Sequence, residues 1–384
     1  MKDFDKIIGI IGGGQLGKML IESTRKWNIN YHILDVENAP SKHLAKKHII
    51  GGLKDSKAIK ELSSGVDVLT YEIEHIDIET LAQLEKEGKE VIPSSSVLQI
   101  INDKGIQKQF YKENGIASSN FVFADSPKEW EELSLELKGE KVVIKSRTGG
   151  YDGKGVKVVS KKELTSTKIQ EQFDMPCILE ECIDFEKELA VIVVVDNKQN
   201  TLCYPAVEME FHPVANLVEF LFAPAIISQD IEEKAKDLAI ETALALDSPG
   251  LFAVEMFLTK DGAVLVNETA PRPHNSGHHT IEGCVTSQYE QLNRILLNLP
   301  LGDTALRRPT AMINIIGAES VYGAYNLENI DVVLAMKGVH LHMYNKAETK
   351  PYRKLGHVTI EEDSIEALKE KAKKVLSLLK VINA

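Results

Sequence analysis

The stretch VLVNETAPRPHNSGH, residues 264–278, joins an apolar strand to a short polar segment and decides the fold class. The run Val264–Glu268 predicts a strand. Pro271 and Pro273 then restrict the backbone of a segment that concentrates Arg, His, Asn and Ser side chains. One such histidine alone would more often be structural. A rigid polar segment after a strand, however, suits ligand binding better than packing, so we expect a binding site here.

Two carboxylates lie in neighbouring apolar strands that a short turn connects. Glu255 lies inside Val254–Leu258, and Glu268 ends Val264–Glu268. Buried carboxylates repel each other and lose hydration, and a divalent cation relieves both effects. Mg²⁺ takes few protein carboxylates and shares its remaining shell with phosphates, and Asn267 can add an amide oxygen. The alternative is a pair of exposed hairpin carboxylates, which fits the apolar neighbours less well.

A glycine-rich segment, Gly149-Gly150-Tyr151-Asp152-Gly153-Lys154-Gly155, separates the predicted strands Val142–Lys145 and Val156–Val159. Glycines let backbone N–H groups approach a polyphosphate, and Lys145 and Lys154 can add positive charge. No helix follows, so this is not a GxxxxGK[ST] loop. The alternative is a plain hairpin turn, but four glycines with Tyr and Asp exceed what a turn needs.

The N-terminal motif Gly12-x-Gly14-x-x-Gly17 follows the predicted strand Lys6–Ile11, and Asp35 ends the next strand. This spacing is typical of NAD-binding domains. The same glycines serve any tight turn that packs a helix against a sheet, and the helix N-terminus could bind another anion. Strands alternating with helices before residue 100 predict a parallel α/β sheet.

Near the C-terminus, Lys346 and the segment Lys350–His357, which contains Arg353 and Lys354, form a local basic cluster. Such a cluster could clamp a phosphate. A solvated loop is the alternative.

The composition limits the partners. The net charge is −12 and the sequence pI is about 5.5, which makes nucleic acid and anionic membranes poor partners. The four cysteines form no CxxC pair, which indicates a reducing compartment. The N-terminus runs directly into a strand, without the pattern of a signal peptide or membrane span, so we expect a cytoplasmic protein.

Together these motifs resemble the ATP-grasp superfamily and, within it, the 5-(carboxyamino)imidazole ribonucleotide synthetases, which are carboxylases of purine synthesis. The resemblance covers nearly the whole chain. The motifs that occur in the family's order are IIGGGQLGKML, TYEIEH, GGYDGKG, FEKE, NETAPRPHNSGH and RKLGH. The run from Asn267 to His278 is specific to the family, whereas the glycine fingerprint is not.

The resemblance implies an α/β and α+β chain with an ATP-grasp fold in three domains. These are a Rossmann-like N-terminal domain (residues 1–100), an ATP-grasp domain (101–305, with a glycine-loop lid subdomain at about 118–183) and a small β-rich C-terminal domain (306–384). It also implies Mg²⁺ as the cofactor and a homodimer. The implied substrates are ATP, bicarbonate and 5-aminoimidazole ribonucleotide. ATP would convert bicarbonate to carboxyphosphate, and the amine would attack this species or the CO₂ that it releases.

The resemblance further implies roles for single residues. The ATP-binding residues would be Lys104, Lys145, Gly150, Tyr151, Asp152, Gly153, Lys154, Gly155, Val156, Glu180, Glu181, Cys182, Ile183, Glu188, Asn267 and Glu268. The metal ligands would be Glu255, Asn267 and Glu268. The aminoimidazole ribonucleotide would contact Gln15, Tyr151, Arg272, His274, Asn275, Ser276, Lys346 and Arg353. The catalytic candidates are Asp152, as general base or orienting group, Lys346, and Lys354, which would help to bind bicarbonate or carboxyphosphate.

Three positions depart from the family pattern. Lys104 follows Asp103 where the family usually has Arg. Glu208–His212 replaces Glu-Asn-x-His with a short insertion, which puts a role for His212 in doubt. Lys350 stands where Arg is frequent, which keeps the charge but loses the bidentate fork.

Three other functions remain open from the residues alone. Another ATP-grasp ligase, such as a formate-dependent purine transformylase, would keep the acidic pair and the glycine loop but not the RPHNSGH run. An oxidoreductase would rest on the N-terminal fingerprint only. A non-catalytic nucleotide-binding module is disfavoured because Glu255, Glu268 and Asp152 are all present.

Overall fold

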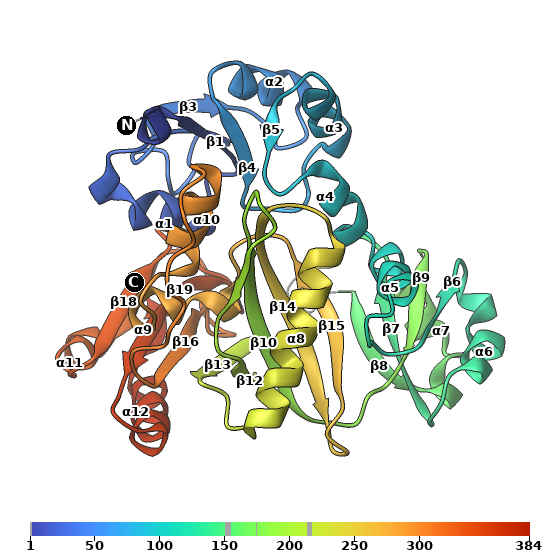
Figure 1. Ribbon diagram of the computed structural model, residues 1–384. Helices are drawn as coiled ribbons and strands as arrows, with labels where there is room; N and C mark the ends of the chain where they lie inside the picture. The colour runs from blue at the N-terminus through green and yellow to red at the C-terminus, as the bar shows by residue number, and fades with distance from the viewer. Residues whose placement is uncertain (1, 150–154, 174, 213–216) are drawn as a thin grey trace.

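A computed structural model describes residues 2–149, 155–173, 175–212 and 217–384. Figure 1 shows an N-terminal parallel sheet at the top, a small antiparallel sheet at the right and a large antiparallel sheet that runs from the centre to the left. This mixed architecture, with a parallel N-terminal sheet and two antiparallel sheets, agrees with the expected α/β and α+β class.

The N-terminal sheet has five parallel strands in the order β3-β2-β1-β4-β5. The strands are β1 (Ile7–Ile11), β2 (Asn30–Asp35), β3 (Lys47–Ile50), β4 (Val68–Tyr71) and β5 (Glu90–Val91). The helices are α1 (Gln15–Ser23), α2 (Ser56–Ser64), α3 (Ile78–Lys86) and α4 (Ser95–Ile101). The central strand β1 is almost wholly buried, because a parallel sheet is covered on both faces.

The small sheet has the order β6-β9-β7-β8 and is antiparallel throughout. Its strands are β6 (Phe121–Ala124), β7 (Lys141–Ser146), β8 (Val156–Ser160) and β9 (Cys177–Glu181). The helices of this part are α5 (Lys104–Glu113), α6 (Trp130–Leu133) and α7 (Thr167–Gln172). The predicted strands on either side of the glycine-rich segment are thus confirmed, and they pair with each other.

The large sheet follows the path β15-β14-β10-β12-β13-β16-β19-β18, with β11 beside β10. Its strands before residue 300 are β10 (Phe185–Val195), β11 (Thr201–Cys203), β12 (Val207–Phe211), β13 (Val218–Ala223), β14 (Gly250–Thr259) and β15 (Val264–Ala270). Its later strands are β16 (Thr310–Ile316), β18 (Val339–Met343) and β19 (Lys354–Glu361). Because β13 pairs with β16, one sheet runs on into the C-terminal segment.

Helices cover both faces of the large sheet. The helix α8 (Gln229–Ala245) packs on the face of β10, β14 and β15 that carries Val191, Val254 and Met256 (Figure 1). On the opposite face, α10 (Gln288–Leu296) shares a core with Ile192 of β10 and with α1 of the N-terminal domain. The acidic pair lies on this second face, between the domains.

The remaining elements complete the C-terminal part and the short connections. They are α9 (Thr280–Gly283), β17 (Tyr325–Glu328), α11 (Ile330–Leu334), α12 (Ile365–Leu378) and β20 (Lys380–Asn383). The 3-10 helices are η1 (Lys2–Asp5), η2 (Arg25–Trp27), η3 (Pro127–Glu129), η4 (Ser134–Glu136), η5 (Lys161–Glu163) and η6 (Asn275–Gly277). Across the described ranges, no helix combines the length and apolar character needed to cross a lipid bilayer.

Three histidine rings stack where the segment after η6 meets β18 and β19. The ring centroids of His278 and His357 are 4.5 Å apart, and those of His342 and His357 are 4.4 Å apart. His278 and His357 are fully buried, and Tyr344 Oη lies 2.8 Å from His357 Nδ1. Burial, followed by the charge of neighbouring histidines, holds the pKa of His278 and His357 well below the usual value, so these two rings are neutral.

We predict that acid destabilises the protein through this stack. Below about pH 6.5 the unfolded chain takes up protons on these histidines, whereas the buried rings in the folded chain do not. Stability is therefore complete above that pH and decreases as the pH falls below it. His357→Phe keeps a ring but removes one titrating group, so its free energy of unfolding should fall by about 1–2 kcal/mol less than that of wild type between pH 7 and pH 5. Urea unfolding at both pH values measures this difference, and equal losses would contradict the prediction.

Candidate active site

The centre of the site is the pair Glu255 and Glu268, which face each other across β14 and β15. They are direct partners in the strand register, beside a bulge between Glu255 and Met256. Since alternate residues of a strand face opposite sides, Val254 and Met256 contact the α8 side, and Glu255 points to the other face. The expected juxtaposition of the two carboxylates is therefore present.

The two carboxylates differ in their electrostatic surroundings. Burial and the charge of Glu268 raise the pKa of Glu255. Lys104 Nζ lies 2.7 Å from Glu268 Oε2, and this lysine lowers the pKa of Glu268. The side chain of Glu268 is still 42% exposed, so a ligand can reach it. Glu268 is thus held as an anion, whereas burial and the neighbouring carboxylates outweigh the positive charges of Lys354 and Lys104 at Glu255.

This pair fits a divalent cation. A cation between the carboxylates would supply the charge that Glu255 lacks, and the amide oxygen of Asn267 is adjacent in the chain. In the described residues no set of three His, Cys, Asp or Glu side chains is arranged to hold a metal without help. Mg²⁺ typically takes one or two carboxylates and completes its shell with phosphate oxygens and water.

A second cluster connects Asn267 to the small sheet. Lys145 on β7 donates to Asn267 Oδ1 at 3.0 Å and pairs with Glu180 Oε1 on β9 at 3.0 Å. Although burial raises the pKa of Glu180, the charges of Lys145 and Lys108 outweigh it and lower that pKa to about 2. The structure thus brings the predicted residues Lys145, Glu180 and Asn267 together.

The other residues predicted for the nucleotide lie at the end of β9 and the start of β10. Glu181 accepts hydrogen bonds from Asn120 Nδ2 and from the backbone of Lys138, both at 3.0 Å, so its carboxylate turns away from Glu180. Cys182 and Ile183 follow as a partly exposed connection. Burial, followed by the charge of Glu268, raises the pKa of Glu188 to about 7.

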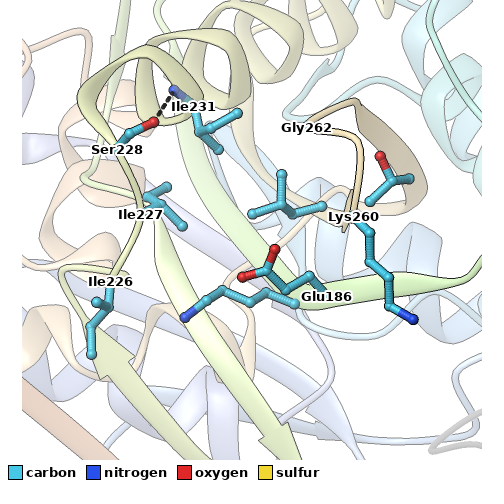
Figure 2. A pocket seen from close by; sticks show the side chains of 10 residues that line it. Glu186, Ile226, Ile227, Ser228, Ile231, Lys260 and Gly262 are labelled. Atoms are coloured by element: carbon cyan, nitrogen blue, oxygen red, sulfur yellow. Dashed lines mark hydrogen bonds between the residues drawn. The ribbon is translucent and has the colours of Figure 1, made fainter.

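Two cavities flank the start of β10. One, of about 380 Å³, contains the predicted Glu188 among its lining residues, together with residues 208–211. The other, of about 340 Å³, lies beside the N-terminus of α8, where Ser228 accepts from the backbone of Ile231 (Figure 2). Lys187 and Leu258 line it on the α8 face, and none of the predicted site residues does. The cavity beside Glu188 is therefore the one that can belong to the predicted nucleotide site.

The polar segment after β15 points towards the N-terminal domain and β16. Arg272 Nη2 pairs with Glu74 Oε1 at 3.0 Å. His274 Nδ1 lies 2.9 Å from Ser276 Oγ and 3.6 Å from Glu255 Oε1. The amides of Asn275 and Asn314 exchange hydrogen bonds at 2.9 Å. His274 thus lies beside the acidic pair and Arg272 beside Glu74, whereas Asn275 and Ser276 are buried and engaged internally.

The predicted basic residues come from the end of β18 and the start of β19. Lys346 Nζ donates to Gln15 Oε1 at 3.1 Å, which joins the C-terminal segment to the N-terminal domain. Lys354 is close enough to Glu255 and His278 for its charge to lower both pKa values. Arg353 donates to the carbonyl of Glu348 at 2.8 Å. Lys346 and Gln15, which were both predicted to contact the aminoimidazole ribonucleotide, are therefore hydrogen-bonded to each other.

Part of the glycine-rich segment lies outside the described residues, namely Gly150, Tyr151, Asp152, Gly153 and Lys154. Its last residue is described: the carbonyl of Gly155 accepts from the backbone of Ser146 at 2.8 Å. Val156 pairs with Lys145 across β7 and β8. The loop thus begins and ends beside Lys145.

The glycine fingerprint of the N-terminal domain binds the protein's own carboxylates. Glu72 accepts from the backbone N–H groups of Gly14 and Gly17, the latter at 2.6 Å, and Asp35 accepts from Gly13 at 2.7 Å. A Cβ at Gly12 or Gly14 would lie 2.5 Å from the Glu72 side chain. The glycines therefore make room for Glu72, and the geometry argues against the oxidoreductase reading.

Sequence reasoning missed several residues that hold the site together. Glu72 and Glu74 were noted only as part of a motif. The bidentate pair of Arg147 and Asp103, with its shortest contact at 2.7 Å, fixes the start of α5 and thereby Lys104. Lys108 also escaped notice. The sequence gives little indication of these contacts, because partners such as Asp103 and Arg147 lie far apart in the chain.

Comparisons with known protein families cover most of the chain. Residues 5–102 match the ribonucleotide synthetase preATP-grasp domain, residues 109–289 the ATP-grasp domain, and residues 310–371 the phosphoribosylaminoimidazole carboxylase C-terminal domain. Together with the site geometry, these matches define an ATP-grasp protein. Within that class, the chain belongs to the N5-carboxyaminoimidazole ribonucleotide synthetase family.

Solved structures and curated relatives agree with this placement. The synthetase from Thermotoga maritima is 42% identical with a TM-score of 0.89, and the match covers 99% of this chain and 100% of that one. The Aspergillus clavatus synthase, solved with ADP and 5-aminoimidazole ribonucleotide, is 32% identical with a TM-score of 0.89 and 98% coverage of both chains. The phosphoribosylaminoimidazole carboxylase of Vigna aconitifolia is 37% identical over 95% of this chain, but the chain spans only 66% of that protein.

We predict that Glu72→Gln destabilises the N-terminal domain. An amide presents only one acceptor oxygen, so one of the two N–H groups at Gly14 and Gly17 would lose its partner, at a cost of about 1–3 kcal/mol in the free energy of unfolding. Urea denaturation measures this value, and Glu37→Gln, at an exposed site in the same domain, is the matched control. Equal stability of both variants would contradict the assignment of Glu72 as the anion of this loop.

Proposed function

We propose that the chain is an ATP-dependent carbon–nitrogen ligase that carboxylates 5-aminoimidazole ribonucleotide with bicarbonate, giving N5-carboxyaminoimidazole ribonucleotide in purine synthesis. The observation that carries the proposal is the continuity of residues 267–276. Asn267 contacts Lys145, and Glu268 is the partner of Glu255 in the acidic pair. Further along the segment, Arg272 pairs with Glu74, and His274 lies 3.6 Å from Glu255. One segment can thus hold the phosphoryl donor next to the acceptor. The family membership supports the same reaction.

The reaction needs an activated form of bicarbonate, which is a poor electrophile. Transfer of the γ-phosphoryl group to bicarbonate releases ADP and gives carboxyphosphate. The exocyclic amine of the ribonucleotide then attacks the carboxyl carbon, and phosphate leaves. Lys104 and Lys145, which lie beside Glu268 and Asn267, would neutralise phosphoryl oxygens, and bound Mg²⁺ would add positive charge there.

We assign the ATP subsite to the lysine cluster and the cavity beside Glu188. In this assignment Lys104 and Lys145 bind phosphates, and Glu188 binds ribose hydroxyls. Since the carboxylates of Glu180 and Glu181 are engaged elsewhere, residues 180–183 would contact the adenine through their backbone. The glycine-rich residues Gly150, Tyr151, Asp152, Gly153, Lys154, Gly155 and Val156 would cover the phosphates. Glu255, Asn267 and Glu268 would hold Mg²⁺.

We assign the acceptor subsite to the region between the N-terminal domain, the polar segment and the basic cluster. Arg272, His274, Lys346 and Gln15 line it from three parts of the chain. Asn275 and Ser276 are buried, so they would support the residues that line this acceptor subsite. Tyr151 and Arg353 complete the set, Lys354 binds bicarbonate or carboxyphosphate, and Asp152 takes or orients the proton of the amine.

We also propose the domain boundaries, the location and the assembly that the sequence predicts. The three domains would divide near residues 100 and 305, with a lid at about 118–183. The protein would act as a cytoplasmic homodimer on small-molecule substrates.

We predict that ADP release by the purified protein requires both bicarbonate and 5-aminoimidazole ribonucleotide. A coupled assay with each acceptor added alone and together measures this dependence, with formate as the competing carbon source. Release that is stimulated by formate and a purine precursor would point to a transformylase. Release that needs neither bicarbonate nor the aminoimidazole would refute the proposed reaction.

We predict that Glu268→Gln lowers kcat for ADP formation about a hundredfold or more, because it removes a metal-ligand charge and the partner of Lys104. Steady-state kinetics at saturating Mg-ATP measures the loss. Glu241→Gln, at an exposed position of α8, is the control and should leave turnover unchanged. Wild-type turnover in Glu268→Gln would remove the metal assignment.

A further inference from the structure

Lys108 is a buried lysine with no place in the mechanism above. It lies on α5, one helical turn after Lys104, and its side chain is 2% exposed. Burial of an ammonium group is costly unless partners compensate it, and lysines are almost never fully buried without them. The position of Lys108 therefore requires an explanation in terms of what it contacts.

Its partners form one compact cluster. Lys108 Nζ donates to Ser119 Oγ at 2.7 Å and lies 3.3 Å from Glu180 Oε2. Ser119 in turn donates to the same Glu180 Oε2 at 2.7 Å. The other carboxylate oxygen, Glu180 Oε1, faces Lys145 Nζ at 3.0 Å. Both oxygens of one buried carboxylate are thus fixed, one by Lys108 and Ser119 and the other by Lys145.

The charges of this cluster determine how much positive charge Lys145 can offer to a ligand. With Lys108 charged, Glu180 is shared between two ammonium groups, and the cluster of Lys108, Lys145 and Glu180 carries a net positive charge. Burial lowers the pKa of Lys108 to about 8, so it is still mostly protonated at neutral pH. Without Lys108, Glu180 would neutralise Lys145 alone, and Glu180 Oε2 would lose one of the two groups that fix it.

We infer that Lys108 is a positioning residue for the nucleotide: by sharing Glu180 with Lys145, it holds the Lys145 ammonium group at Asn267 and keeps that group's positive charge available to polyphosphate. The inference rests on the ATP subsite of the proposed function. Lys108 itself touches neither acceptor residues nor the acidic pair in the described contacts. Its effect should therefore appear in nucleotide affinity, and the acceptor's KM should not change.

Two variants separate this role from simple packing. Lys108→Met keeps the length and apolar stem of the side chain but removes the charge. Ser119→Ala removes only the hydroxyl that bridges Lys108 and Glu180. Lys112→Met, at an exposed position one turn further along α5, is the matched control.

Titration calorimetry of each full-length variant with Mg-ADP tests the inference. We expect Lys108→Met to weaken binding about tenfold or more and Ser119→Ala about threefold, both without a change in the KM for 5-aminoimidazole ribonucleotide. Lys112→Met should bind as wild type does. Affinity of Lys108→Met equal to wild type would overturn the inference, even if its melting temperature fell, because that pattern is purely structural.

The remaining outcomes are also decisive. If Lys108→Met does not fold, weakened binding by Ser119→Ala supports the inference and unchanged binding overturns it. If wild type does not bind Mg-ADP, the proposed ATP subsite fails, and the inference fails with it. If wild type binds Mg-ADP but needs no bicarbonate for turnover, only the carboxylation proposal fails.

Discussion

The constraint on which the site depends is the opposition of two carboxylates, Glu255 and Glu268, on neighbouring strands inside the protein. Such a pair is unfavourable unless positive charge compensates it. The fold compensates the two carboxylates unequally: Lys104 on α5 binds Glu268, whereas the charges of Lys354 and Lys104 do not outweigh burial at Glu255, whose pKa stays raised. The imbalance leaves one place where a divalent cation with its phosphate ligands would stabilise the protein and be stabilised by it.

The surrounding architecture keeps this arrangement in register. The pair of Arg147 and Asp103 connects the start of α5 to the residue after β7, so Lys104 of α5 faces the hairpin of β14 and β15. The pairing of β13 with β16 then carries the large sheet into the C-terminal segment, which brings Lys346 towards Gln15. The proposed donor and acceptor subsites would therefore share the segment after β15.

Local sequence patterns were sufficient to predict the parts of the candidate site that lie within one strand or turn. Glu255 and Glu268 stood out because apolar residues flank them, and the strands Val254–Leu258 and Val264–Glu268 are present within slightly longer elements. The role of Glu72 was not predictable, because it lies 55 residues from Gly17. Likewise, Lys108 contacts Glu180 only because α5 packs on β9, which no local pattern indicates. The NAD alternative loses its support in the same way, since Glu72, which directly follows β4, accepts from the N–H groups of Gly14 and Gly17.

The most direct test of the account is to locate the metal. Crystals grown with Mn²⁺ and a non-hydrolysable ATP analogue should show an anomalous scattering peak between the carboxylates of Glu255 and Glu268, with Lys104 drawn towards the phosphates. A bound nucleotide whose metal lies away from both carboxylates, or a Glu255–Glu268 pair that keeps Lys104 as its only cation, would contradict it.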